Sequence, residues 1–397
     1  MGKLTRELRR RLEFAHGGSL GGDDEAAFRQ LEMLAAVAKK DNPKPYEFDR
    51  KFLFKVLCLG NSQLAQIVGA RGPNAQTNAA CAGTTQAVAI AEDMLRAGRC
   101  ERVVVVAGDN ASSPALLPWL GNGFRALGAA STAAAVADAA LPFDRRRNGM
   151  LLGAGAVGMV LETAAAYAKR VGVGRLPPGF GFDQCSGAGG GPGAIGGEVQ
   201  EGRAGVQGQQ PEWELPKASA PPLPPQPKAR LVATQYSNSA FHGAALDRRH
   251  IASELKRFLA ALKAEHGISP EQIARRGVYL SHETCTHASP SSSCAFNEIG
   301  ALRDAFGKEL LPHLLILNTK GFTGHAMGAS FEDVTAVEIL RRQAVPPNAN
   351  SFTADPHLGD IKLSTGGAYS ADYALRFSAG FGSHVCFALY SALTAPF

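Results

Sequence analysis

The chain of 397 residues lacks several features that define common protein classes. It has only two tryptophans, and charged residues make up 19% of it. No apolar run reaches the roughly 18 residues that a membrane span needs, so no membrane insertion is expected. No group of closely spaced basic residues is interleaved with aromatics, and a formal net charge of +6 is modest for this length. Nucleic-acid binding is therefore not predicted.

Paired cysteines are also missing: the seven cysteines stand singly and are odd in number. This usage argues against a disulfide framework and predicts a reducing compartment, so a cytoplasmic location is expected. The first 16 residues are rich in arginine but contain Glu7 and Glu13 and have no apolar centre. They do not read as a secretory signal, and they leave organellar import open.

What the chain does have is 45% apolar residues, 45 glycines and 23 prolines, and the stretch between about residues 171 and 228 is dominated by Gly, Pro, Ala and Gln. A segment of that composition cannot bury enough apolar surface to offset the entropy of ordering. Residues 166–229 are therefore predicted to be a disordered Gly/Pro-rich insertion. The expected organisation is a helical extension over 1–45, one half over 46–165, the insertion, and a second half over 230–397.

The periodicity of apolar residues predicts alternating helices and strands, which is typical of the α/β class. The valine run over 102–108 predicts a strand that is buried on both faces, as in a parallel sheet. The expected elements are helices over 3–14, 24–40 and 52–68, an extended segment ending at Cys81, a helix over 84–97, strands over 102–108, 157–162 and 230–236, helices over 247–266 and from 269, strands over 277–281 and 314–317, and a helix over 329–342.

Cys81 stands between small residues where the extended segment is expected to give way to a helix. A thiol at a helix N-terminus feels the partial positive charge of free N–H groups, which favours the thiolate. The alternative is a small core residue, because free cysteine is among the most buried side chains. His282, at the end of an expected strand, and His325, after a glycine-containing turn, favour the first interpretation. A cysteine with distant histidines is the usual form of a thiol-based acyl-transfer site.

Five short motifs now give the chain a resemblance. From about Tyr46 to Tyr390, apart from the insertion, it resembles the β-ketoacyl synthases of the thiolase-like superfamily, and it looks closest to the synthase domains of large type I polyketide and fatty-acid enzymes. The motifs are Ala79–Gly83 around the cysteine, Pro142–Arg145 leading into Gly153–Ala156, His282-x-Thr284-x-Thr286, Lys320 through Thr323-Gly324-His325, and Ser378–Gly382.

The resemblance implies a duplicated αβαβα layered fold with mixed sheets. Members carry a glycine-rich opening strand and more chain ahead of the cysteine, so an N-terminally shortened chain with an incomplete first half is expected. The implied activity is that of an acyltransferase, the decarboxylative Claisen condensation of an acyl-enzyme with a malonyl thioester in fatty-acid or polyketide biosynthesis. The alternative is a non-catalytic partner or truncated remnant of the chain-length-factor type.

The resemblance also implies a role for each matching residue. Cys81 is the nucleophile, His282 and His325 stabilise the enolate, and Lys320 orients the pair. The N–H groups of Cys81 and Phe381 form the oxyanion hole, and the Phe381 ring is the gate for acyl chains. Thr284 and Thr286 bind the phosphopantetheine arm, and Glu298 is the candidate partner of Lys320 if about five residues are inserted before it.

No tightly bound cofactor is implied, because the substrate travels on the phosphopantetheine of an acyl carrier protein, either separate or within a multienzyme. A homodimer is implied as well. Two departures stand in the histidine motif, where Glu283 and Cys285 replace glycines.

Two other motif readings fail on context, so neither a metal nor a nucleotide is expected. The segment from His282 to His287 lacks the second histidine four positions on that a zinc-protease motif requires. Gly153-x-Gly155-x-x-Gly158 matches the dinucleotide fingerprint in letters only, because it is expected to open a strand rather than a helix.

Overall fold

The computed structural model describes residues 29, 32–33, 57–172, 226–287, 293–350 and 353–394. They belong to two units, Met1–Gln76 and Thr77–Phe397. The expected helix over 3–14 and residues 173–225 of the insertion lie outside the described residues. So does the expected helix over 24–40, apart from residues 29, 32 and 33, which are helical.

The first unit contributes the helix α3, Leu57–Val68, which confirms the C-terminal part of the helix expected over 52–68. It ends at Gly69, whose φ of 70° is the left-handed conformation in which glycine commonly ends a helix. Beyond the turn, the Asn61 side-chain amide donates a 2.7 Å hydrogen bond to the Asn74 side chain, so the segment after the helix is tied back to it.

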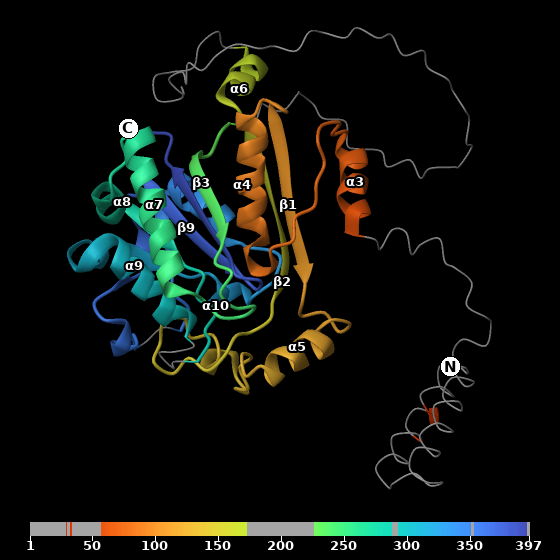
Figure 1. Ribbon diagram of the computed structural model, residues 1–397, viewed down its shortest axis with the longest axis vertical. Helices are drawn as coiled ribbons and strands as arrows, with labels where there is room; N and C mark the ends of the chain where they lie inside the picture. Colours follow the sequence, from red (N-terminus) through yellow and green to blue (C-terminus); the bar gives the residue numbers. More distant parts are fainter. Residues whose placement is uncertain are drawn as a thin grey trace. The chain divides into compact units, whose positions relative to one another are not determined.

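The second unit is built on a mixed sheet of six strands in the order β3-β10-β9-β4-β5-β7 (Figure 1). Its strands β9, β4, β5 and β7 are parallel to one another, whereas β10 pairs antiparallel with both β9 and β3. The strands of the unit are β1 Arg102–Asn110, β2 Ala154–Glu162, β3 Arg230–Asn238, β4 Gly277–Leu280, β5 Leu315–Leu317, β6 Ala344–Pro347, β7 Lys362–Leu363, β8 Thr365–Ala368, β9 Tyr373–Gly380 and β10 His384–Ser391.

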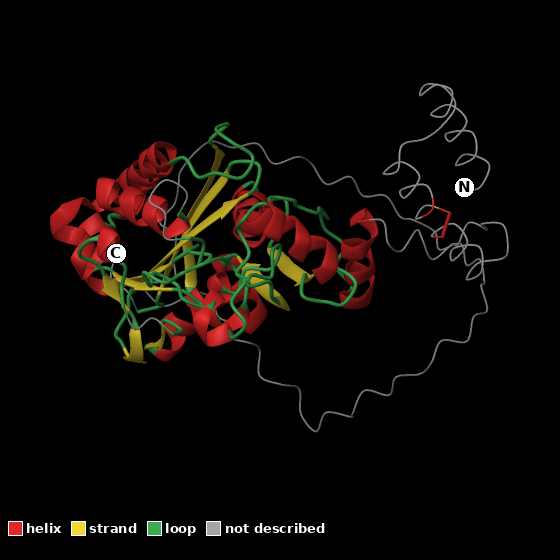
Figure 2. Ribbon diagram, turned by 90° about the horizontal axis from the view of Figure 1, so that it is seen from below, coloured by secondary structure: helices red, strands yellow, loops and turns green. Residues whose placement is uncertain are grey.

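Helices cover both faces of this sheet (Figure 2). The helices α7, α8 and α9 pack on one face, and α4 and α11 lie on the other face, between the six-stranded sheet and the pair β1–β2. The remaining bounds are α4 Gly83–Arg96, α5 Leu117–Ala126, α6 Ala164–Val171, α7 Arg248–His266, α8 Pro270–Arg276, α9 Cys294–Leu310, α10 Lys320–Thr323 and α11 Glu332–Arg342, with 3₁₀ turns η2 Ala80–Ala82, η3 Val136–Asp138, η4 Leu311–His313 and η5 Pro356–Leu358.

The expected strand over 102–108 forms, but its predicted environment is wrong. The strand β1 pairs antiparallel with β2, and these two are the whole of that sheet among the described residues. Val105 packs inward against α4, whereas Val104 and Val106 are 46% and 51% exposed. A continuous apolar run signals burial on both faces only when a further layer covers the outer face, and no described residue of the second unit supplies that layer.

The layered α/β arrangement confirms the expected fold class, and the thin first sheet fits an incomplete first half. The helix α6 extends to Val171, so the segment expected to be disordered begins with ordered helix up to residue 171. Within the described residues, no helix combines the length and apolar character needed to cross a bilayer.

Close packing explains the glycines of the apparent dinucleotide fingerprint. A Cβ at Gly153 would lie 2.2 Å from the Thr323 carbonyl oxygen, and one at Gly155 would lie 2.3 Å from the Phe331 ring. Both contacts are shorter than real Cβ contacts allow, so the backbone at these positions must lack a side chain. The motif leads directly into β2, as predicted, and its glycines serve the approach of two loops.

Candidate active site

The thiol of Cys81 lies in the 3₁₀ turn η2, directly before α4. The preceding residue, Ala80, adopts a φ of 46°, a conformation that non-glycine residues rarely take. Contacts from the six-stranded sheet hold this sharp turn. The Ser378 hydroxyl donates to the Cys81 carbonyl at 3.2 Å, and the chain at Gly380 passes so close that a Cβ there would lie 2.1 Å from the Ala79 oxygen. The expected strand ending at Cys81 is therefore wrong: residues 73–79 form no strand, and Ala80–Ala82 form a turn.

His325 is the side chain nearest the nucleophile. Its Nε2 lies 3.0 Å from the Cys81 Sγ, within hydrogen-bonding distance, although the two residues are 244 positions apart. The backbone of His325 is fixed on both sides by the loop before β2. Its N–H donates to the Leu151 carbonyl at 2.7 Å, and its carbonyl accepts from the Gly153 N–H at 3.0 Å. The glycine at position 153 thus serves to position the histidine.

His282 follows β4, where the carboxyl ends of the parallel strands β4 and β5 meet. Its ring centroid is 6.0 Å from that of His325, with the two rings nearly perpendicular. The Lys320 ammonium donates to the His282 carbonyl at 2.6 Å, and its Nζ lies 3.2 Å from Nδ1 of the same residue. Because an ammonium offers only donors, Nδ1 acts as the acceptor and Nε2 carries the ring proton.

Burial controls the protonation of these groups. It lowers the pKa of His325 to about 3, and the positive charges of Lys320 and Arg376 act in the same direction. The same causes hold the pKa of His282 well below its ordinary value. Both imidazoles are therefore neutral near pH 7, which is the form that donates a hydrogen bond from one ring nitrogen and accepts at the other.

The expectation that the helix N-terminus makes Cys81 a stable thiolate is wrong for the protein without substrate. Burial is the largest influence and raises the pKa of the thiol, although Lys320 and the N–H groups of Cys81 and Phe381 lower it. Removing a charged sulfur from water costs more than these donors return. The thiol must therefore lose its proton as it reacts, and the neutral His325 ring is placed to accept it.

Phe381 lies at the turn after β9, and its backbone N–H is directed at the Cys81 sulfur, as the predicted oxyanion hole requires. Its ring stacks on Phe124 of α5, with centroids 5.9 Å apart. Phe124 was not predicted. It is buried, whereas Trp119 and Leu117 of the same helix are exposed, and no signal in the sequence separates it from these two.

The predicted pantetheine residues occupy the segment after His282. Thr284 and Thr286 are both partly buried, and the Thr286 hydroxyl oxygen accepts a 3.2 Å hydrogen bond from the Cys294 N–H. Their role toward a substrate stays a prediction. The neighbouring Cys285 adopts a φ of 60°, which explains why a glycine suits its position and shows that cysteine is tolerated there.

The expected pairing of Lys320 with Glu298 is corrected. The carboxylate at ion-pair distance from Lys320 is that of Glu332, at 3.8 Å. Glu298 instead accepts the His282 N–H on Oε1 at 2.9 Å, so it fixes the backbone of the catalytic segment. Allowing for an insertion of about five residues predicted correctly that Glu298 lies near the site, but it did not predict which group Glu298 contacts.

Glu332 and Arg376 are functional neighbours that the sequence interpretation missed. Arg376 is fully buried in β9 and donates to the Ser330 hydroxyl at 2.9 Å and to Glu332 at 3.3 Å. Together with Lys320 it lowers the pKa of Glu332 to about 2, against the effect of burial. A lone arginine within an otherwise apolar strand pattern was the available signal, since such a group is buried only with a partner.

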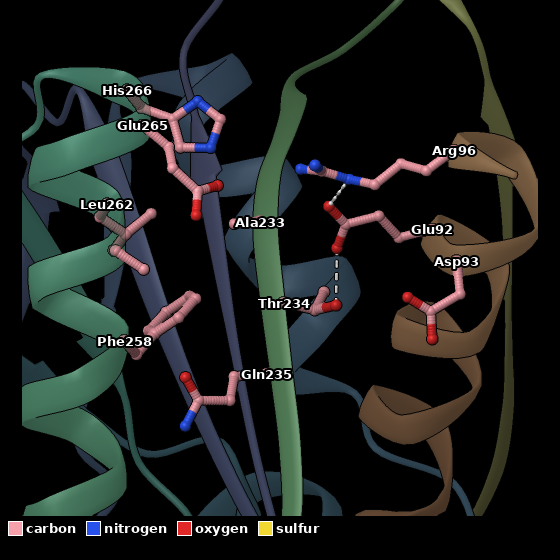
Figure 3. A pocket seen from close by; sticks show the side chains of 11 residues that line it. Glu92, Asp93, Arg96, Ala233, Thr234, Gln235, Phe258, Leu262, Glu265 and His266 are labelled. Carbon is pink, nitrogen blue, oxygen red and sulfur yellow. Dashed lines mark hydrogen bonds and ion pairs between the residues drawn. The ribbon is translucent and has the colours of Figure 1, made fainter. Parts of the chain in front are cut away.

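A surface pocket of about 220 Å³ lies elsewhere, between α4, β3 and α7 (Figure 3). The carboxylate of Glu92 accepts from the Thr234 hydroxyl at 2.6 Å and from Arg96 at 2.7 Å. None of the predicted catalytic residues lines this pocket. Glu92 thus joins two of the lining side chains, and we assign the pocket no chemistry.

The site thus joins a thiol, two neutral imidazoles and a lysine from loops far apart in the sequence, and two N–H groups point to the sulfur. A buried nucleophile with a base at hydrogen-bonding distance and preorganised donors defines a thiol-dependent acyl-transfer centre.

Comparisons with known proteins agree with this class. A family profile described as "Beta-ketoacyl synthase, N-terminal domain" matches residues 24–166. The 3-oxoacyl-[acyl-carrier-protein] synthase 2 of Vibrio harveyi is 26% identical over 389 residues, which cover 96% of this chain and 75% of that protein. The chain is thus similar to β-ketoacyl synthases: the profile covers residues 24–166, and the likeness to the Vibrio harveyi enzyme extends over nearly the whole chain.

Solved structures show the same fold. A β-ketoacyl synthase from Burkholderia phymatum matches with a TM-score of 0.62 and 17% identity, over 91% of this chain and 72% of that one. A type II polyketide ketosynthase, solved with its acyl carrier protein and bound to a hexaketide, matches with a TM-score of 0.64 and 20% identity, over 87% of this chain and 69% of that one.

Proposed function

We propose that this chain catalyses the decarboxylative Claisen condensation of β-ketoacyl synthases in fatty-acid or polyketide biosynthesis, with Cys81, His282, His325 and Lys320 as its catalytic groups. The observation that carries the proposal is the 3.0 Å approach of His325 Nε2 to the Cys81 Sγ. A non-catalytic partner would have no need of this contact inside a buried site.

In the first step an acyl group moves from a carrier thioester to the enzyme. The Cys81 sulfur attacks the acyl carbonyl while its proton passes to His325. The oxyanion accepts hydrogen bonds from the N–H groups of Cys81 and Phe381, and the carrier thiolate leaves and takes the proton that His325 accepted. The burial that raises the pKa of Cys81 also excludes the water that would hydrolyse the acyl-enzyme.

In the second step a malonyl thioester loses carbon dioxide, and the electron pair of the broken bond forms an enolate. The Nε2–H of the neutral His282 ring stabilises the enolate oxygen, together with the Nε2–H of His325 in the tautomer that this ring adopts once Cys81 is acylated. The contact of Lys320 with His282 Nδ1 supports this role, because it leaves the proton on Nε2. The enolate carbon attacks the acyl carbonyl, and the Cys81 thiolate leaves and takes up a proton.

The finer parts of the proposal follow from the family. The acyl and malonyl groups are carried on the phosphopantetheine of an acyl carrier protein, which is separate or within the same multienzyme, and Thr284 and Thr286 bind that arm. We further propose that the working form is a homodimer.

The test is mass spectrometry after treatment with a cerulenin-type epoxide, together with release of carbon dioxide from malonyl carrier protein. We expect one adduct, on Cys81, and none after Cys81→Ala. His325→Ala should abolish decarboxylation and slow self-acylation without abolishing it, because it removes the base beside Cys81. The control His313→Ala, at a ring that contacts Arg275, should leave both intact. An intact folded chain that reacts at other cysteines but not at Cys81 would contradict a catalytic role.

A further inference from the structure

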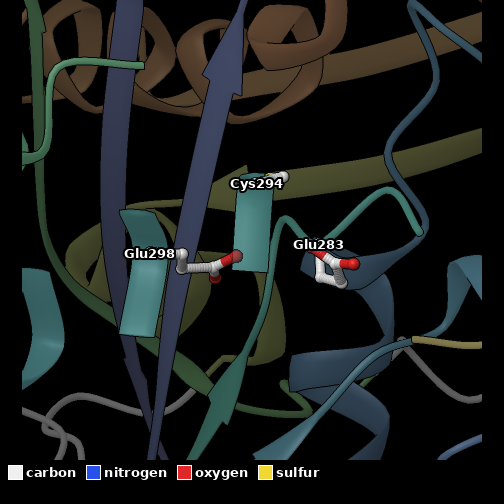
Figure 4. Close-up of side chains that lie close together, drawn as sticks. All are labelled: Glu283, Cys294 and Glu298. Carbon is white, nitrogen blue, oxygen red and sulfur yellow. The ribbon is translucent and has the colours of Figure 1, made fainter. Parts of the chain in front are cut away.

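Three ligand-type side chains gather beside the catalytic segment at a place that the proposed reaction does not use. One ligand atom from each of Glu283, Cys294 and Glu298 lies within 4.8 Å of the other two, and all three residues are buried (Figure 4). Cys294 and Glu298 stand four positions apart at the start of α9, so they share one face of the helix. Glu283 approaches from the segment after His282.

The carboxylate of Glu283 is only partly satisfied. Its Oε1 accepts the Cys285 N–H at 3.0 Å and lies 3.8 Å from the Arg147 guanidinium. Its Oε2 is buried without a hydrogen-bond partner. A buried carboxylate oxygen without a partner costs free energy comparable to a lost hydrogen bond to a charged group. Binding of a cation at this oxygen would remove that cost.

The buried charges around the cluster do not balance. Arg147 pairs with Asp355 at 2.7 Å, and Arg376 and Lys320 lie at 3.3 and 3.8 Å from Glu332. Among these groups, five buried acidic side chains face three buried basic ones. The acids are Glu283, Glu298, Glu332, Asp333 and Asp355, and the cations are Arg147, Lys320 and Arg376.

We propose that Glu283, Cys294 and Glu298 form a binding site for a divalent cation of the zinc type. A divalent ion would add positive charge where acidic side chains outnumber basic ones, and it would bind the free Glu283 Oε2. A donor set of one sulfur and two carboxylates suits zinc, which accepts thiolate and carboxylate ligands, better than magnesium or calcium, which take oxygen ligands. A water would complete four-fold coordination.

Such an ion would tie the start of α9 to the segment that carries His282. Glu298 already holds the His282 N–H, and the Cys294 Sγ lies 4.0 Å from the His282 carbonyl oxygen. The site would therefore position the catalytic segment without touching the substrate. This inference does not depend on the condensation chemistry, because its readout is metal binding.

The experiment is calorimetric titration of the metal-free protein with Zn²⁺, and absorption spectroscopy with Co²⁺ to detect a sulfur-to-metal charge-transfer band. Both are done in a Cys81→Ser background, which removes the active-site thiol as a rival ligand. We expect one Zn²⁺ per chain, a cobalt–thiolate band, and a rise in the unfolding temperature with Zn²⁺. Cys294→Ser should remove the band and weaken binding by more than about tenfold, since even changes to outer-shell partners cost 10- to 100-fold.

Glu283→Gln, which keeps the shape of the side chain, should also weaken binding more than about tenfold, and Cys100→Ser is the matched control that should not. Circular dichroism verifies that each variant is folded. The proposal is overturned if the Cys81→Ser protein binds no zinc, or if its zinc affinity and cobalt band survive both Cys294→Ser and Glu283→Gln.

Discussion

The two sheets of the second unit bury similar strands to very different degrees. The strand β9 is buried at every position from Tyr373 to Ala379, whereas β1, although equally apolar, buries only Val105 and exposes Val104 and Val106. The six-stranded sheet has helices on both faces, whereas the described helices of the second unit cover only one face of the pair β1–β2. Apolar sequence alone therefore does not determine burial; the number of covering layers does.

This contrast extends to the active site. The nucleophile lies on the β1–β2 side of the unit, at the start of α4. The groups that fix and activate it come from the six-stranded sheet and its loops. Ser378 and Gly380 hold the turn at Cys81, and His325 reaches its sulfur. The six-stranded sheet and its loops thus supply the rigidity on which the geometry of the active site depends, and the predictions below test this division.

The largest expected effect is in the buried charge network around Arg376 of β9. Arg376→Met removes the guanidinium and leaves Glu332 and Asp333 buried with less compensation. Breaking a buried pair from one side typically costs about 3–5 kcal/mol. We expect a loss of this size in the free energy of unfolding, measured by urea denaturation.

The control is Arg341→Met, which removes an exposed partner of Glu338 and should cost less than about 1 kcal/mol. Equal losses of unfolding free energy in the two variants would mean that the buried network contributes no more to stability than an exposed ion pair.

The second effect is on the contact between the halves. Gly380→Ala places a Cβ against the Ala79 oxygen and should displace the turn that carries Cys81. Misplacement by about 1 Å can cost on the order of 100-fold in rate, so we expect such a loss in self-acylation. Gly123→Ala is the control, because a Cβ there meets nothing within 4 Å and self-acylation should be unchanged. A Gly380→Ala protein that acylates at the wild-type rate would show that the contact does not set the position of the thiol.

The sequence predicted what depends on local signals. The small residues around Cys81 and the turn glycines before His325 can be recognised from a short segment alone. The structure brings the side chains of Cys81 and His325 together. The order of strands and helices was predictable for the same reason, because apolar periodicity is a local property.

The sequence did not predict what depends on neighbours from elsewhere in the chain. The exposure of Val104 is decided by a covering layer, and the pKa of the thiol by the balance of burial against nearby donors. The partner of Lys320 proved to be Glu332 and not Glu298, since an ion pair depends on which helix start lies beside the lysine. These are tertiary properties, and no spacing within one segment reports them.

A third prediction concerns pH. The folded pKa of His325 is about 3, below the roughly 6.5 expected when the chain is unfolded. Between these values the unfolded state binds more protons, so stability is unaffected above about pH 6.5 and is lost as the pH falls toward 3. Between pH 7.5 and 5 the loss due to His325 is up to about 2 kcal/mol.

His325→Gln should remove that part of the acid destabilisation, as measured by urea unfolding at the two pH values. His313→Gln, on the exposed turn η4, should retain it. If the unfolding free energy falls by the same amount between pH 7.5 and 5 in His325→Gln and in the wild type, the imidazole of His325 is not held neutral by burial.

The smallest effects compare the two sheets directly through one substitution. Val278→Ala in β4 removes a fully buried side chain and should cost about 2 kcal/mol, from lost burial and the cavity that remains. Val106→Ala in β1 removes a side chain that is 51% exposed and should cost about 0.5 kcal/mol, since the water that already covers it leaves little burial to lose. Urea denaturation of both variants measures the difference. If Val106→Ala costs as much as Val278→Ala, the outer face of β1–β2 is covered in solution by residues outside those the structure describes, and the two sheets are alike in the folded protein.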